Sequence, residues 1–188
     1  MDQDILINIH SIIPFSRVNG PGNRLVIFFQ GCDLKCQGCF NSGTHSFDNM
    51  NLYHPSDVFQ RYLRQDIEGV TISGGEPFYQ AIGLLSLLKF AKESYGLSTI
   101  VYTGLAYERL KKIREYRLCF NFIDVLIDGR YEESKKETTL LARGSSNQKF
   151  YFFTNRYRQA NLYMLSKAEI LIGKDGTITK TGFSKVDF

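Results

Sequence analysis

The stretch LVIFFQGCDLKCQGCFN, residues 25–41, joins a short apolar run directly to a loop that holds three of the four cysteines of the chain. The run Leu25–Phe29 has the length and composition of a buried strand. Cys32, Cys36 and Cys39 follow with the spacing C-x3-C-x2-C. A structural zinc site needs four ligands, and a disulfide framework needs an even number of cysteines. Three thiolates instead favour a [4Fe–4S] cluster with one iron open to a small chelating molecule, the alternatives being a zinc knuckle or a chance grouping.

The composition of the chain is that of an ordinary globular protein. Its 188 residues fit one domain with a sizeable core, so we expect a single domain over residues 1–188. Hydrophobic residues make up 43%, and a net charge of +4 is too small to predict a nucleic-acid surface. The N-terminus lacks the pattern of a secretory signal, and no apolar run approaches the roughly 20 residues of a membrane span. We therefore expect a cytoplasmic protein with reduced thiols and with no membrane or nucleic-acid partner.

Short apolar runs alternate with helical patterns along most of the chain, which predicts an α/β fold with a mostly parallel sheet. The expected strands are Ile5–Ile13, Leu25–Phe29, Val70–Ile72, Thr99–Tyr102 and Ile123–Ile127. The expected helices are Pro55–Asp66, Pro77–Tyr95 and Tyr107–Tyr116.

The C-terminal part, residues 154–188, is harder to assign. A strand is expected just before it at Lys149–Phe153, and Asn161–Ser166 has a weak helical pattern. The pair Asp175-Gly176 between two short apolar runs, 170–173 and 177–181, predicts a β-hairpin.

Four loops follow four of the expected parallel strands, at the end of the sheet where ligands bind in α/β folds. They are the cysteine loop (residues 31–41), Ser73–Pro77, Thr103-Gly104 and Asp128–Arg130. The order of strands and loops therefore predicts one site built from all four loops.

The second motif of this site is SGGEP, residues 73–77. Gly74 and Gly75 permit close approach of the backbone, Glu76 offers a carboxylate to an ammonium group, and Pro77 suits a first helical position. The cysteine triplet with the following Phe40, together with SGGEP, resembles the signature of the radical S-adenosylmethionine (SAM) superfamily. An ordinary strand-to-helix turn is the alternative for SGGEP taken alone.

The flanking sequences narrow the resemblance to the glycyl-radical-enzyme activases. The stretches VNGPGNRLVIFFQGCDLKCQGCFNSGTH, EGVTISGGEPF, DVLIDGRYEE and ARGSSNQ are similar to that family in order, most closely to the group that acts on the anaerobic ribonucleoside-triphosphate reductase. The resemblance covers roughly residues 15–150. It implies a partial, open (βα) barrel, SAM as cofactor, and removal of hydrogen from a glycine of a partner glycyl radical enzyme. The expected partner is the anaerobic ribonucleotide reductase, and the expected electron donor is a flavodoxin or ferredoxin.

The resemblance also implies roles for individual residues. Cys32, Cys36 and Cys39 would be cluster ligands, and the adjoining Phe40 and Asn41 would lie at the cofactors. The residues expected to contact SAM are Gly74, Gly75, Glu76, Thr103, Asp128 and Arg130, although Asp128 reads equally well as a turn residue and Thr103 as a strand-end cap. In many activases an Asp stands where this chain has Asn19, which leaves the role of that acid in doubt here.

Two other functions compete with this interpretation. The first is a radical SAM enzyme that acts on a small molecule or peptide, as in the deazaguanine-forming family, for which a closed polar pocket would be expected. The second is a non-catalytic iron–sulfur electron-transfer module, which would need a complete set of cysteine ligands. The apolar surroundings of Cys119 favour a buried structural thiol, but its presence beside the triplet would support the second function.

Overall fold

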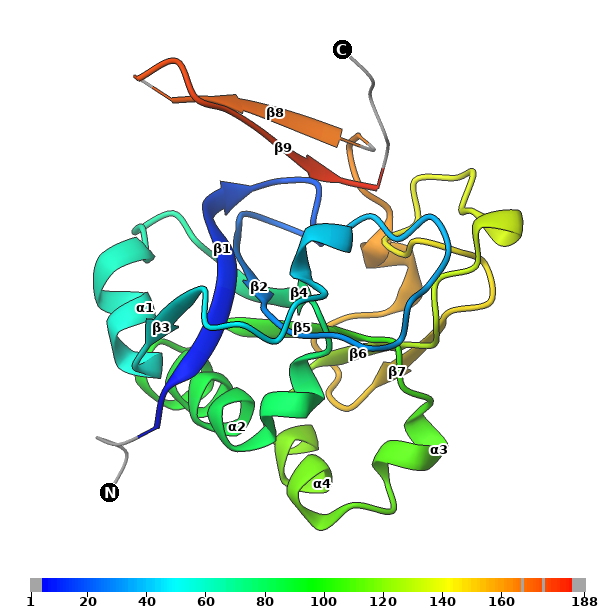
Figure 1. The fold of residues 1–188 in the computed structure, drawn as a ribbon, viewed down its shortest axis with the longest axis horizontal. Coiled ribbons are helices and arrows are strands. Elements are labelled where there is room, and N and C mark those ends of the chain that lie inside the picture. The colour runs from blue at the N-terminus through cyan, green and yellow to red at the C-terminus, as the bar shows by residue number, and fades with distance from the viewer. Residues whose placement is uncertain (1–4, 167, 174, 184–188) are drawn as a thin grey trace.

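The computed structural model describes residues 5–183, except residues 167 and 174. Within these residues, seven strands form one open sheet in the order β3-β1-β2-β4-β5-β6-β7 (Figure 1). The strands are β1 (Ile7–Ser16), β2 (Arg24–Phe29), β3 (Asn51–Tyr53), β4 (Gly69–Gly74), β5 (Ser98–Thr103), β6 (Val125–Asp128) and β7 (Lys149–Phe152).

Most strands of this sheet share one direction. The central strands β2, β4, β5 and β6 pair in parallel. Strand β1 joins β2, β3 joins β1, and β7 joins β6 in the antiparallel sense. Strand β3 therefore runs with the central four, so five of the seven described strands point the same way. The expected fold class, an open α/β fold with a mostly parallel sheet, is confirmed.

The helices are shorter than the sequence pattern predicts. They are α1 (Pro55–Tyr62), α2 (Ala81–Lys89), α3 (Tyr107–Leu110) and α4 (Arg114–Phe120). The helix expected over Pro77–Tyr95 consists of a 3-10 turn, α2 and a π turn, and Ile113 takes an extended conformation that separates α3 from α4. This break lets both Leu110 and Cys119 reach the core, where each is fully buried. No helix in the described part of the chain is long and apolar enough to cross a membrane.

The C-terminal region contains the predicted hairpin. Strands β8 (Ala168–Ile172) and β9 (Ile178–Gly182) pair in the antiparallel sense and form a second, two-stranded sheet. Gly176 in the turn has a positive φ of 81°, which explains the Asp-Gly pair. The helix expected over Asn161–Ser166 is only a short 3-10 turn, Gln159–Leu162. Figure 1 shows the hairpin, in orange and red, lying apart from the main sheet.

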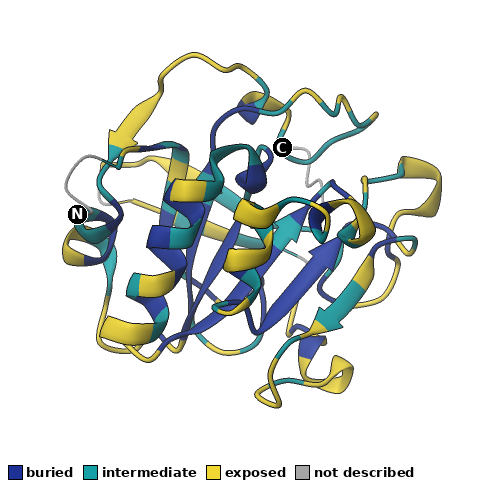
Figure 2. Cartoon of the chain, turned by 90° about the horizontal axis from the view of Figure 1, so that it is seen from below, coloured by how far each residue is buried: buried dark blue, intermediate teal, exposed yellow. Residues whose placement is uncertain are grey.

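Alternate residues of the central strands face two different cores. Leu25, Ile27 and Ile72 pack with residues of α1 and α2, which cover one face of the sheet. Ile100 and Ile127 face the other way and pack with residues of the 141–164 segment. Figure 2 shows the result: the strands are dark blue behind helices whose outer turns are yellow. Because both faces of the central strands are covered, these strands read as nearly continuous apolar runs.

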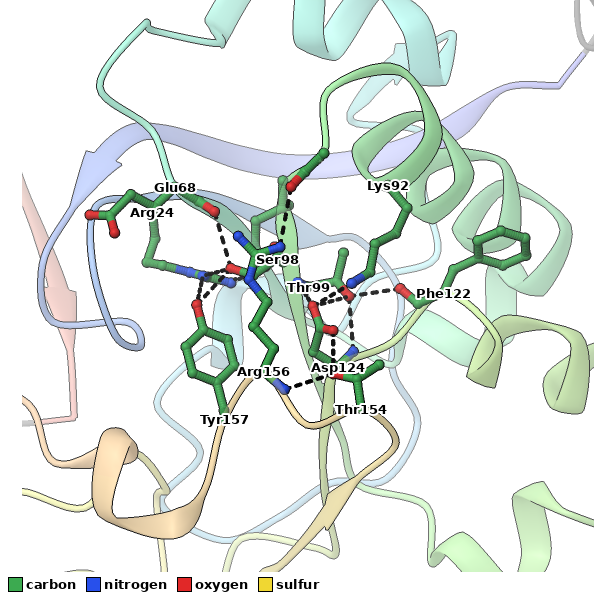
Figure 3. Close-up of polar contacts among 12 residues, drawn as sticks. Arg24, Glu68, Lys92, Ser98, Thr99, Phe122, Asp124, Thr154, Arg156 and Tyr157 are labelled. Carbon is green, nitrogen blue, oxygen red and sulfur yellow. Dashed lines mark hydrogen bonds and ion pairs between the residues drawn. The ribbon is translucent and has the colours of Figure 1, made fainter.

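A buried polar network closes the N-terminal end of the parallel strands (Figure 3). Arg24, at the start of β2, is fully buried and donates hydrogen bonds to the hydroxyl oxygens of Thr71 (3.1 Å) and Ser98 (2.5 Å) and to the carbonyl of Val70 (2.5 Å). Tyr157 reaches the same place and donates to Ser98 at 2.8 Å. Burial lowers the pKa of Arg24 to about 10, so its guanidinium stays charged at neutral pH.

A second part of the network fixes Asp124, the residue before β6. It accepts hydrogen bonds from Lys92 (2.6 Å), Thr154 (2.6 Å) and the amide of Thr99 (2.8 Å). Burial acts to raise the pKa of Asp124, but the bonds from Lys92 and Thr154 outweigh it and lower that pKa overall. The charged and polar groups at this end of the sheet are therefore satisfied by one another.

Replacing Arg24 by alanine should destabilise the fold strongly. The change leaves a cavity and removes the donor from three buried acceptors, so we expect the free energy of unfolding to fall by about 3 kcal/mol or more. Arg64→Ala is the matched control, because the side chain of Arg64 is 57% exposed and pairs with Asp66 at the surface; its effect should stay below about 1 kcal/mol. Denaturant titration of both variants under nitrogen measures the difference, and equal losses would contradict this account of Arg24.

Candidate functional site

The candidate site begins where strands β2 and β4 end side by side. Their parallel register pairs Phe29 with Gly74. The pairing then continues past the strands, because the amide of Gly75 donates to the carbonyl of Phe29 (2.8 Å) and the amide of Glu76 donates to the carbonyl of Gly31 (2.9 Å). The SGGEP loop and the start of the cysteine loop are therefore joined by backbone hydrogen bonds.

Gly74 and Gly75 are needed for this contact between loops. Gly74 has a positive φ of 101°, and a Cβ there would lie 2.4 Å from the backbone nitrogen of Phe29. A Cβ on Gly75 would lie 2.4 Å from the carbonyl oxygen of Gly31. Sequence analysis expected these glycines to admit a ligand. In the structure they admit the neighbouring loop, and they also line the cavity described next.

The side chains of Cys32, Cys36 and Cys39 are each partly buried, and all three residues border one cavity of about 260 Å³. A turn that joins the amide of Cys39 to the carbonyl of Cys36 (3.2 Å) brings these two residues together. Among the described residues, no three His, Cys, Asp or Glu side chains are grouped to hold a single metal ion. Cysteine thiolates are the ligands that hold iron–sulfur clusters in proteins.

Burial raises the pKa of the Cys32 thiol to about 11. Iron coordination deprotonates a thiol, so the ligands would become thiolates as a cluster binds. Cys119 does not belong to this group: it is fully buried in the core beneath α2, and its sulfur faces the carbonyl of Ala81 at 3.7 Å.

The cavity brings together most, but not all, of the residues expected from the sequence. Phe40, Asn41 and Thr103 line it with the three cysteines and the two glycines. Asn19 and Gln148, which belong to stretches that the sequence analysis singled out, also line it. Sequence reasoning missed a further group of lining residues: Phe28, Tyr102, Tyr131 and Lys180–Phe183. Phe28 and Tyr102 could have been found from strand alternation, since they face the side of the sheet opposite α1 and α2. The contribution of Lys180–Phe183 had no local signal.

Glu76, which the sequence analysis expected to contact the ligand, is fully buried and is not among the residues that line the cavity. Its carboxylate accepts hydrogen bonds from the hydroxyl of Thr103 (2.8 Å) and from the amides of Gly104 (2.8 Å) and Phe78 (3.1 Å). Burial raises the pKa of Glu76 to about 7, although these hydrogen bonds favour the charged form. Glu76 therefore links the SGGEP loop to the loop after β5, and it holds two residues that border the cavity.

Asp128 and Arg130 do not line the cavity. One carboxylate oxygen of Asp128 accepts a hydrogen bond of 2.6 Å from the amide of Tyr107 at the start of α3. The Arg130 side chain is exposed. Their neighbours Gly129 and Tyr131 border the cavity instead, and the ring of Tyr131 packs against that of Phe40 with 4.9 Å between centroids.

The RGSSNQ segment, residues 143–148, fastens this wall of the cavity. The side-chain oxygen of Gln148 accepts from the amides of Gly144 (2.8 Å) and Ser145 (3.1 Å), and its nitrogen donates to the carbonyl of Gly129 (2.8 Å). The guanidinium of Arg143 donates to Glu137 at 2.6 Å. The polar residues of RGSSNQ thus support the backbone that carries Tyr131.

Asn19 also lines the cavity. Its side chain is buried and donates hydrogen bonds to the hydroxyl oxygens of Ser16 (2.9 Å) and Thr181 (2.7 Å). The amide at this position, where many activases have an acid, therefore connects the loop before β2 to strand β9.

Comparison with known proteins finds a matching family model and similar proteins. A family model described as a 4Fe-4S single cluster domain matches residues 18–151. An anaerobic ribonucleoside-triphosphate reductase-activating protein of Enterobacteria phage T4 is 33% identical over 155 residues, which cover 79% of this chain and 96% of the relative. Relatives with the same description from Pasteurella multocida and Escherichia coli K12 are 34% and 29% identical; the matches cover 75% and 76% of this chain and 94% and 96% of the relatives. Among solved structures, QueE from Escherichia coli is similar with a TM-score of 0.46 and 18% identity over 55% of each chain.

A methyl group on Gly75 should prevent assembly of the site. Gly75→Ala forces the SGGEP loop away from Gly31, so we expect reconstitution with iron and sulfide under nitrogen to give less than about a tenth of the wild-type iron content. Gly43→Ala is the matched control in the cysteine region, because a Cβ there would meet only the His10 ring at an ordinary 3.5 Å. Normal iron content in Gly75→Ala would show that the contact between the loops is dispensable.

Loss of the Gln148 side chain should loosen the wall that carries Tyr131. Gln148→Ala frees two amides and one carbonyl, and we expect hydrogen exchange at Gly144 and Ser145 to accelerate about tenfold. Asn147→Ala, which removes one bond to the carbonyl of Arg130, is the matched control and should leave those two amides protected. Exchange followed by mass spectrometry of peptides covering residues 140–150 distinguishes the two variants.

Proposed function

This chain belongs to the family of anaerobic ribonucleoside-triphosphate reductase-activating proteins, which are glycyl radical activases with a 4Fe-4S domain, and we propose that the cavity beside its three cysteines is where the activase reaction takes place. The observation that carries the proposal is the hydrogen-bonded contact between the cysteine loop and the SGGEP loop, which puts both motifs at one cavity.

We assign the [4Fe–4S] cluster to Cys32, Cys36 and Cys39. Three thiolates leave one iron without a protein ligand, and S-adenosylmethionine would bind there through its methionine part. When bound, these two cofactors supply a one-electron cleavage that yields a 5′-deoxyadenosyl radical, the species that removes a hydrogen atom from a glycine of the partner. The position of Cys119 in the core supports three ligands rather than four, and this disfavours a simple electron-transfer module.

The remaining lining residues divide naturally between the two parts of S-adenosylmethionine. Gly74, Gly75 and Thr103 lie on the loops after β4 and β5 and would border the methionine part, with Glu76 fixing them. Phe40 and Tyr131 form an aromatic wall suited to the adenine ring. Asp128 and Arg130 stay candidates for contact only through the backbone that follows β6, because neither side chain borders the cavity.

The role of the protein is to orient the cofactors and to shield them from water. The closed N-terminal end of the sheet and the apolar packing around Ile100 exclude water from one side of the cavity. The partner anaerobic ribonucleotide reductase would deliver its glycine from the open side. For the electron donor we propose a flavodoxin or ferredoxin, which the net charge of +4 and the exposed Lys35 in the cysteine loop would attract if the donor is acidic. We also propose that residues 1–188 form a single domain.

The decisive variant is Cys36→Ala, with Cys119→Ala as the matched control. Both chains are reconstituted with iron and sulfide under nitrogen and given S-adenosylmethionine, a strong reductant and the reductase. We expect 5′-deoxyadenosine, measured by mass spectrometry, to fall to background in Cys36→Ala and to persist in Cys119→Ala, together with a glycyl radical signal by electron paramagnetic resonance. A wild-type protein with a full cluster and bound reductase that forms no 5′-deoxyadenosine would refute the proposed function.

A further inference from the structure

The β8–β9 hairpin presents an apolar face to solvent. The register pairs Ile172 with Ile178 and Ile170 with Lys180, so the three isoleucines lie on the same face of this two-stranded sheet. Ile170 is 44% exposed, Ile178 61% and Ile172 74%. Exposed apolar side chains that cluster on one face are a feature of interaction surfaces.

The other face of the hairpin is fixed to the body of the protein. Glu169 and Thr181 are cross-strand partners on that face. Glu169 accepts a hydrogen bond from the amide of Arg17 (3.2 Å), and Thr181 accepts the one from Asn19 (2.7 Å). The ring of Phe183 packs on Tyr102 with 5.8 Å between centroids. Because a two-stranded hairpin is marginal alone, these contacts determine where its isoleucine face points.

The hairpin also borders the cavity. Lys180–Phe183 line it together with the cysteine loop and the SGGEP loop. A protein segment that enters the cavity on this side would pass beside the hairpin. The isoleucine face is continuous with the place where the proposed reaction requires a partner.

The hairpin lies outside the part of the chain that the family model matches. That match covers residues 18–151 and ends before β8 begins at Ala168. The catalytic motifs lie within the shared part, so the hairpin adds a surface to it.

We propose that the face formed by Ile170, Ile172 and Ile178 is a docking surface for the partner glycyl radical enzyme, which covers it with an apolar patch next to its glycine-bearing loop. This inference rests on the proposed function, because the partner is the protein that the activase reaction modifies. The occupant follows from the position of the hairpin at the cavity and from the apolar character of its free face. The hairpin would thus contribute binding energy and leave the cofactor chemistry to the cysteine and SGGEP loops.

The test uses the double variant Ile172→Thr/Ile178→Thr in the full-length, cluster-loaded chain. Threonine keeps the β-branched shape, so the hairpin retains its strand preference while the face becomes polar. Ile82→Thr is the matched control, since Ile82 is 64% exposed but lies on α2, which packs on the main sheet and not on the hairpin. Isothermal titration under nitrogen measures the affinity for the reductase, and 5′-deoxyadenosine formed without the reductase measures cofactor chemistry by itself.

We expect the double variant to bind the reductase at least tenfold more weakly, whereas Ile82→Thr binds like the wild type. Formation of 5′-deoxyadenosine without the reductase should be equal in all three, and the glycyl radical yield should recover at high reductase concentration. If the double variant instead loses the reductase-free reaction, the single variant Ile178→Lys is tested in its place. Its one added charge would disfavour docking of an apolar patch.

Unchanged affinity in both hairpin variants would overturn the inference. Dimerisation of the wild-type chain through this face would also overturn it. Analytical ultracentrifugation would then show a dimer for the wild type and a monomer for the hairpin variants, with no change in reductase binding. Failure of the proposed function is separate: it appears as absence of 5′-deoxyadenosine from the wild type, whatever the affinities are.

Discussion

The site depends on hydrogen bonding between the parallel strands β2 and β4 that continues beyond the ends of both strands. Strands β2 and β4 stop at Phe29 and Gly74, but their hydrogen bonding extends through Gly75 to Gly31. This fixes the first residue of the cysteine loop against the SGGEP loop before any cofactor is present. Because side chains alternate along a strand, a slip of one residue would turn the polar residues of β4 toward the helices. The same register puts Glu76 within reach of the loop after β5, so three loops are positioned by one pairing.

The two ends of the parallel strands have opposite characters. At the N-terminal end, Arg24 and Asp124 are surrounded by donors and acceptors that satisfy them. At the C-terminal end, the cysteines and glycines surround open space. The buried polar network lies at one end and the candidate site at the other, which is the usual division in parallel α/β proteins. The three cysteines can therefore border a cavity without exposing the core.

The sequence predicts what depends on local pattern and spacing. The cysteine triplet, the glycines of SGGEP and the Asp-Gly hairpin turn all carry constraints that act within a few residues, and the structure has each element near the expected place. The rest depends on tertiary contacts. From the sequence, Asp128 is a candidate for contact with a ligand. In the structure its carboxylate accepts a hydrogen bond from the amide of Tyr107 at the start of α3. Gln148 and Asn147 are neighbours with the same side-chain amide group, so the sequence does not distinguish their roles. Only the fold shows that Gln148 bridges two cavity-lining segments.

Asn19 shows how a departure from a family pattern can have a structural reason. An acid at this position would place a negative charge in a buried spot whose two neighbours are the hydroxyls of Ser16 and Thr181. An amide instead donates to both hydroxyl oxygens and needs no counter-ion. Thr181 belongs to the hairpin that lies outside the family-model match, so the residue that departs from the pattern contacts a segment beyond that match. The cavity wall in this protein therefore combines residues of the matched part with a C-terminal hairpin that is attached through Asn19.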